Sequence, residues 1–131
     1  MIYFDSSALV KLVKAEPESR PLAVWIDERA AERSVSSTLA EVEVLLAVRR
    51  GGDRFVERAR SMIDELDLLA ISDEVIDSAA VVDSPGLRSL DAIHLATALS
   101  IRDALTGMVV YDRRLFDAAA RFGLDPIRPG A

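Results

Sequence analysis

Short apolar runs alternate along the chain with longer stretches whose apolar residues recur at helical spacing. The short runs predict buried strands, because runs of about four to eight apolar residues between turn signals are typical of strands in a parallel sheet. The first run is Met1-Ile2-Tyr3-Phe4, and Asp5 ends it. The predicted strands are residues 1–5, 34–37, 68–71 and 108–111, with 126–129 as a candidate edge strand.

The stretches between these strands predict helices, since one face of each is apolar. Stop signals follow several of them: Gly51-Gly52, the turn Ser84-Pro85-Gly86, and Gly123 as a C-terminal cap. The predicted helices are residues 6–14, a helix that begins at 16–18 and runs through 26, and residues 38–50, 55–66, 73–82, 90–104 and 113–122.

Strands and helices thus alternate along the whole chain. In such an order each helix returns the chain to the next parallel strand, and helices cover both faces of the sheet. The predicted fold class is α/β, a three-layer α/β/α sandwich with a mostly parallel central sheet. No linker, repeat or low-complexity segment divides the sequence, so residues 1–131 are predicted to form a single domain.

Composition narrows the possible chemistry. Half of the 131 residues are hydrophobic, yet no run approaches the roughly 18 apolar residues of a membrane span. Asp5, Lys11 and Lys14 interrupt any signal-peptide core, so we expect a cytoplasmic protein. The absence of cysteine excludes disulfides and Cys-ligated zinc, and the single histidine, His94, excludes a pair of histidines for acid–base catalysis.

The chain is acidic, with a net charge of −6 and a pI of about 4.8. This charge argues against a general nucleic-acid coat, which needs a basic face to release counterions from phosphates. It does not exclude a nuclease, since clustered catalytic acids make the total charge negative while arginines bind substrate. Arg113 and Arg114, directly after Asp112, are the predicted phosphate-binding residues.

Four acids carry the functional prediction: Asp5, Glu41, Asp91 and Asp112. Asp5 and Asp112 follow predicted strands, whose carboxyl ends share one edge of a parallel sheet. Each acid alone has a structural explanation as a helix cap or first-turn acid. Together they would repel one another, and a hard divalent cation relieves that repulsion. We therefore predict metal-assisted hydrolysis of phosphodiesters, with Asp5, Asp91 and Asp112 as metal ligands.

We predict Glu41 rather than Glu43 as the glutamate of this site, although Glu43 lies only two positions further along the same predicted helix. Apolar neighbours surround Glu41, so we expect its side chain to face inward and to position water or a second ion. A buried glutamate without a cation would be costly. The alternative is structural, because Thr38 and Glu41 also fit a capping box.

Four segments in this order and spacing resemble the PIN-domain ribonucleases, and specifically the VapC-type toxins of bacterial and archaeal toxin–antitoxin pairs. The Leu-Asp-Ala-Ile-His-Leu-Ala segment is the most specific of them, and together they cover nearly the whole chain. The segments are Ile2-Tyr3-Phe4-Asp5-Ser6-Ser7-Ala8-Leu9, Ser37-Thr38-Leu39-Ala40-Glu41, Leu90-Asp91-Ala92-Ile93-His94-Leu95-Ala96-Thr97-Ala98 and Tyr111-Asp112-Arg113-Arg114-Leu115.

The resemblance implies an endoribonuclease toxin that depends on Mg²⁺ or Mn²⁺, cuts a structured RNA of the tRNA or rRNA class, and is inhibited by a cognate VapB-like antitoxin. It also implies that Ser6 supports the metal ligands, while the family's acidic quartet corresponds to Asp5, Glu41, Asp91 and Asp112. We expect a homodimer, because so small and apolar a domain should have surface left to bury.

Two positions depart from the family pattern. Many relatives have Thr where this chain has Val110, and another acid where it has Arg114. Asp117 is the candidate substitute for that second acid.

His94, three residues after Asp91, is interpreted as a hydrogen-bonded core histidine, since a lone imidazole lacks a partner for acid–base work. Hydrolysis by water is therefore expected, leaving 5′-phosphate and 3′-hydroxyl ends. The alternative function is a catalytically idle PIN-fold binding module.

Overall fold

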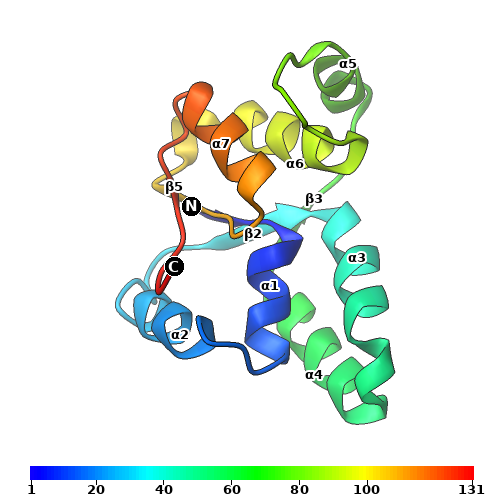
Figure 1. Cartoon of the computed structure of the whole chain (residues 1–131), viewed down its shortest axis with the longest axis vertical. Coiled ribbons are helices and arrows are strands. Elements are labelled where there is room, and N and C mark those ends of the chain that lie inside the picture. Colours follow the sequence, from blue (N-terminus) through cyan, green and yellow to red (C-terminus); the bar gives the residue numbers. More distant parts are fainter.

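The computed structural model describes residues 1–131 and shows a parallel sheet between two layers of helices (Figure 1). The sheet has five strands in the order β3-β2-β1-β4-β5, and every neighbouring pair is parallel. The predicted α/β/α sandwich is confirmed. The strands are β1 (Ile2–Phe4), β2 (Ser34–Ser37), β3 (Asp67–Leu69), β4 (Gly107–Val109) and β5 (Pro126–Ile127).

The helices divide between the two faces of the sheet. In Figure 1, α1 to α4 lie below the sheet and α5 to α7 lie above it. The helices are α1 (Ser6–Val13), α2 (Ser19–Asp27), α3 (Thr38–Val48), α4 (Asp53–Asp64), α5 (Asp73–Val81), α6 (Ser89–Ser100) and α7 (Arg113–Arg121). No helix combines the length and the apolar character that a membrane crossing requires.

Each face of the sheet has its own hydrophobic core, because successive side chains of a strand point to opposite faces. Ile2 and Phe4 of β1 pack among residues of α1, α2, α3 and α4. Tyr3, between them in sequence, packs in the other core with Leu95 of α6 and Leu115 of α7. The central strand therefore holds the two layers together.

The order of the strands reverses direction at β1, and this reversal places a crevice at the carboxyl end of β1. From β1 the chain continues outward to β2 and β3, and then returns to add β4 and β5 on the other side. Ligands of open α/β sheets bind where the order reverses in this way. Asp5 directly follows β1, and Asp112 follows the neighbouring β4, so the topology brings both acids to this crevice.

Most predicted boundaries are correct to within two or three residues. α2 begins at Ser19 rather than at 16–18, because the Ser19 hydroxyl accepts from the amide N–H of Glu16 and donates to the carbonyl of Lys14 in the preceding loop. The predicted helix 90–104 is wrong at its end, since α6 stops at Ser100 and a 3-10 turn follows at Arg102–Ala104. Gly123 ends α7 with a φ of 78°, a conformation that glycine adopts without strain.

Replacing Leu115 by Ala should lower the free energy of unfolding by about 2–5 kcal/mol, because the side chain is fully buried in the core beneath α7. Leu90→Ala is the matched control, since Leu90 is 47% exposed. Urea unfolding followed by circular dichroism measures both. Equal losses in the two variants would contradict the packing described here.

Candidate active site

Asp5 is the most buried acid in the chain, with 3% of its surface exposed. It caps α1, and its Oδ1 accepts a hydrogen bond from the backbone N–H of Ala8 at 3.0 Å. Burial raises the pKa of Asp5 to about 6, although hydrogen bonds from Ser7 and Ala8 partly oppose this. No lysine or arginine forms an ion pair with it. Its negative charge is thus buried without a strong cationic partner.

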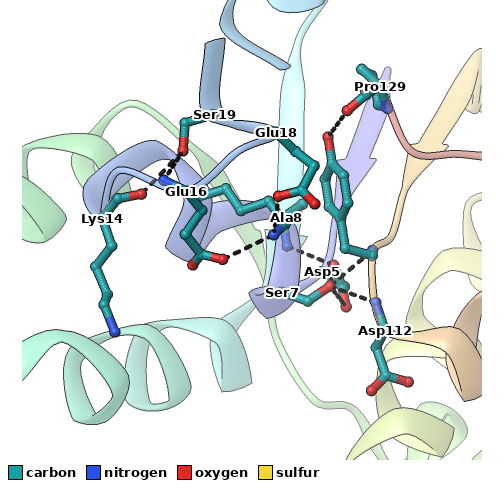
Figure 2. Close-up of polar contacts among 11 residues, drawn as sticks. Asp5, Ser7, Ala8, Lys14, Glu16, Glu18, Ser19, Asp112 and Pro129 are labelled. Carbon is teal, nitrogen blue, oxygen red and sulfur yellow. Dashed lines mark hydrogen bonds and ion pairs between the residues drawn. The ribbon is translucent and has the colours of Figure 1, made fainter. Parts of the chain in front are cut away.

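Ser7 connects Asp5 to the end of the neighbouring strand (Figure 2). Its hydroxyl donates to the carboxylate of Asp5, whose two oxygens each lie 2.7 Å away. The same oxygen accepts the backbone N–H groups of Tyr111 and Asp112, both at 3.0 Å. Sequence reasoning does not single out Ser7, because these partners lie 104 and 105 residues away and no local pattern marks them.

Asp91 and Asp112 lie near one another at the starts of two helices. Asp112 caps α7 by accepting from the N–H of Leu115 at 3.0 Å, and Asp91 in the first turn of α6 accepts from the N–H of Arg88 at 3.3 Å. Burial and then the negative charge of Asp112 raise the pKa of Asp91. The structural explanation of these acids as caps is therefore correct, yet the same geometry brings two of them close enough to repel.

The prediction that Glu41 faces inward is wrong. The side chain of Glu41 is exposed, while Glu43 is half-buried beside Ser6. The capping box with Thr38 is wrong too, because Thr38 is the first residue of α3 and Ser37 is the cap, whose hydroxyl accepts from the N–H of Leu39. Glu41 and Glu43 differ by about 200° around a helix, so only one of them can point toward Asp5.

Glu43 is held by two donors at the cleft. The hydroxyl of Ser6 donates to its Oε1 at 2.6 Å, and Nε2 of His94 lies 2.7 Å from the same oxygen. Burial alone would raise the pKa of Glu43, but the hydrogen bonds from His94 and Ser6 outweigh it and lower that pKa. His94 is buried and also contacts the hydroxyl of Tyr3 at 2.7 Å, so the prediction of a hydrogen-bonded core histidine is confirmed.

A cavity of about 440 Å³ opens beside these groups. Glu43 and Asp112 contribute acidic side chains to its wall, and Ser6 and Ser7 contribute hydroxyls. Lys11 lines it as well, but Glu16 and Glu18 pair with this lysine at 3.0 and 2.9 Å. The net character of the cleft is therefore acidic.

The acids supply the kind of ligand that a divalent cation prefers, but they do not form a complete ligand shell. No three His, Asp or Glu side chains are already arranged as metal ligands. All the available donors are oxygens, however, and neither Asp91 nor Asp112 forms an ion pair with lysine or arginine. Mg²⁺ fits such a set, because it takes few carboxylates and keeps several waters.

The remaining predicted residues lie on α7. Arg113 and Arg114 are exposed and form no ion pair, and the side chain of Arg114 lies near Gly86 in the turn before α6. Asp117 is exposed, and no hydrogen bond or ion pair connects it to another acid. The roles of these three residues stay predictions.

Known proteins resemble this chain in sequence and in fold. The PIN domain family matches residues 2–121. Ribonuclease VapC47 of Mycobacterium tuberculosis is 42% identical over 134 residues, which cover 100% of this chain and 98% of that protein.

Two solved structures have a similar fold at low sequence identity. M. tuberculosis VapC20, described as a sarcin-ricin loop cleaving toxin, has a TM-score of 0.75 at 15% identity and covers 98% of this chain and 100% of its own. A chain of a toxin–antitoxin complex from Klebsiella pneumoniae has a TM-score of 0.69 at 20% identity. The match covers 88% of this chain and 90% of that one. The sequence matches, together with this fold, show that the chain belongs to the PIN-domain family and, within it, to the VapC-type ribonuclease toxins.

Proposed function

We propose that this chain is an endoribonuclease toxin that hydrolyses phosphodiester bonds of structured RNA with the help of Mg²⁺ or Mn²⁺. The observation that carries the proposal is the group of carboxylates at the carboxyl ends of β1 and β4. Asp5 is buried without a lysine or arginine partner and shares the Ser7 hydroxyl with the backbone of Asp112, and the charge of Asp112 in turn raises the pKa of Asp91.

Asp5, Asp91 and Asp112 would hold the cation. Bound there, a divalent cation would lower the pKa of water and neutralise charge that develops on the phosphate. Ser7 keeps Asp5 in place, because its hydroxyl donates to the carboxylate while it is itself fixed by two backbone N–H groups. Glu43, which lines the cleft, is proposed for the role first assigned to Glu41, and its carboxylate would accept a hydrogen bond from the attacking water.

Arg113 and Arg114 are proposed to bind the RNA backbone, since both are unpaired cations at the start of α7, next to Asp112. The RNA class, tRNA or rRNA, is also part of the proposal. The name of one structural relative, a sarcin-ricin loop cleaving toxin, supports a structured target.

An antitoxin is the proposed protein partner, and the toxin–antitoxin complex among the structural relatives supports it. An arginine from such a partner could occupy the acidic cleft and pair with its carboxylates. A homodimer is proposed as well, because α3 and α5 expose large apolar side chains, among them Val42 and Val81.

Asp91→Asn should lower the rate of RNA cleavage roughly 100-fold or more, because it removes one of the charges that hold the cation. EDTA should stop cleavage by the unmodified protein, and Mn²⁺ or Mg²⁺ should restore it. Asp64→Asn is the control, since Asp64 is an exposed acid at the end of α4. Cleavage that persists in EDTA, or that is as fast in the Asp91→Asn variant as in the unmodified protein, would refute the metal mechanism. Absence of any cleavage by the unmodified protein would favour the idle binding module.

Glu43→Gln should lower cleavage by about 10- to 100-fold, whereas Glu41→Gln should leave it near the original rate. The reason is that Glu43 reaches the cleft and Glu41 is exposed on another side of α3. Single-turnover cleavage of a labelled RNA measures both variants. A larger loss in the Glu41 variant would restore the original prediction from sequence.

The cleaved RNA should carry 5′-phosphate and 3′-hydroxyl ends. Water is the expected nucleophile, because the only histidine is buried and no histidine pair can promote attack by the 2′-hydroxyl. Ligation of adaptors that require each kind of end, followed by sequencing, distinguishes the products. Ends with a 2′,3′-cyclic phosphate would show that another reaction takes place.

A further inference from the structure

Glu43 is connected through His94 to the core of the opposite helical layer. Glu43 belongs to α3 on one face of the sheet, while His94 belongs to α6 on the other face, and the side chain of Tyr3 on β1 packs on the same face as His94. The hydroxyl of Tyr3 is 2.7 Å from Nδ1 of His94, and Nε2 of His94 is 2.7 Å from Oε1 of Glu43. Tyr3 and His94 are both buried, with 0% and 2% of their surfaces exposed.

The chemistry of the three groups gives this chain of hydrogen bonds one direction. A tyrosine hydroxyl is protonated at neutral pH and can donate to an unprotonated Nδ1, which lies 2.7 Å away. The carboxylate of Glu43 can only accept. Nε2 of His94 therefore carries a proton and donates to Glu43, and the Nδ1 of this tautomer is left to accept from Tyr3. The ring also packs edge-on against Tyr3, with centroids 5.9 Å apart, which restricts its rotation.

Only one oxygen of Glu43 is used by these contacts. Ser6 and His94 both donate to Oε1, and no protein group donates to Oε2. A glutamate side chain has several rotatable bonds, and fixing it costs conformational entropy that two strong hydrogen bonds can offset. With Oε1 held, Oε2 is left for a group in the cleft.

We propose that Tyr3 and His94 are positioning residues that hold Oε1 of Glu43, so that Oε2 is presented to the substrate side of the active site. This proposal rests on the proposed ribonuclease function. It goes beyond that function because it assigns roles to a core tyrosine and a core histidine that do not themselves touch substrate or cation.

A purely structural role is the competing explanation, because buried polar groups need hydrogen bonds wherever they lie. Thr97 provides the matched control. It is buried on α6 one turn after His94, and its hydroxyl donates to the carbonyl of Ile93 without contact to Glu43. Tyr3→Phe and Thr97→Val each remove one buried hydroxyl and little else, so a general effect on packing should be similar in both.

The histidine ring can be observed without interference, because the chain has a single histidine. In protein labelled with ¹⁵N-histidine, the two ring nitrogens should show the neutral tautomer with the proton on Nε2. Tyr3→Phe should change the Nδ1 resonance and allow a mixture of tautomers, whereas Thr97→Val should leave both resonances in place. The spectrum is recorded without RNA or metal, so it does not depend on activity.

Cleavage kinetics complete the test. Tyr3→Phe should lower kcat by about 10- to 100-fold and leave KM nearly unchanged, while Thr97→Val keeps the original kcat. His94→Gln should retain more activity than His94→Leu, because the amide nitrogen of glutamine can still donate to Glu43 and its oxygen can accept from Tyr3.

Two results would overturn the positioning role: a ring protonated on Nδ1 in the unmodified protein, or a kcat for Tyr3→Phe equal to that of Thr97→Val. Failure of the proposed function would look different. The unmodified protein would then cleave no RNA, while its histidine spectrum would still show the Nε2 tautomer.

Discussion

The carboxylate of Asp5 is buried at the end of the central strand with no lysine or arginine to neutralise it. A buried charge of this kind is costly unless hydrogen bonds or a cation compensate it. The hydroxyl of Ser7 and the N–H of Ala8 supply part of that compensation, yet burial still raises the pKa to about 6. Other acids lie at the same edge of the sheet: the backbone N–H of Asp112 shares the Ser7 hydroxyl with Asp5, and Asp91 is close enough to Asp112 for that charge to raise its pKa.

Both helical layers contribute to this site, and the sheet edge joins them. Asp5 and Glu43 come with α1 and α3 from one layer, and Asp91 and Asp112 come with α6 and α7 from the other. Two hydrogen-bond systems fix the arrangement. Ser7 joins the end of β1 to the chain that follows β4, while His94 reaches across from α6 to Glu43. The reversal of strand order at β1 makes both possible, because it leaves a crevice between neighbouring strands.

The sequence is informative where local chemistry decides the structure. The apolar run before Asp5 predicts β1, and the acids after strands predict helix caps that the structure contains. The orientation of α3 cannot be predicted in the same way, because this helix is apolar nearly all round, and large side chains such as Val42 and Leu46 are exposed while Ala40 and Val44 are buried. An apolar neighbourhood in sequence therefore does not mark the inner face, and for this reason the expectation that Glu41 faces inward is wrong.

Long-range contacts account for the other features of the site that the sequence does not predict. Ser6 and Ser7 look alike in the sequence, but Ser7 has its partners in Tyr111 and Asp112, which only the pairing of β1 with β4 brings near. The assignment of His94 to the core is correct, while its contact with Glu43, 51 residues away, depends on how α3 and α6 meet the sheet edge.

The most direct test of the shared cation is crystallographic. Crystals soaked in Mn²⁺ and measured with X-rays at an energy where manganese scatters anomalously should show a peak bounded by the carboxylates of Asp5, Asp91 and Asp112. A peak at that place would establish that a cation compensates the buried charge. Manganese bound only elsewhere, or no peak at concentrations that support RNA cleavage, would contradict the account.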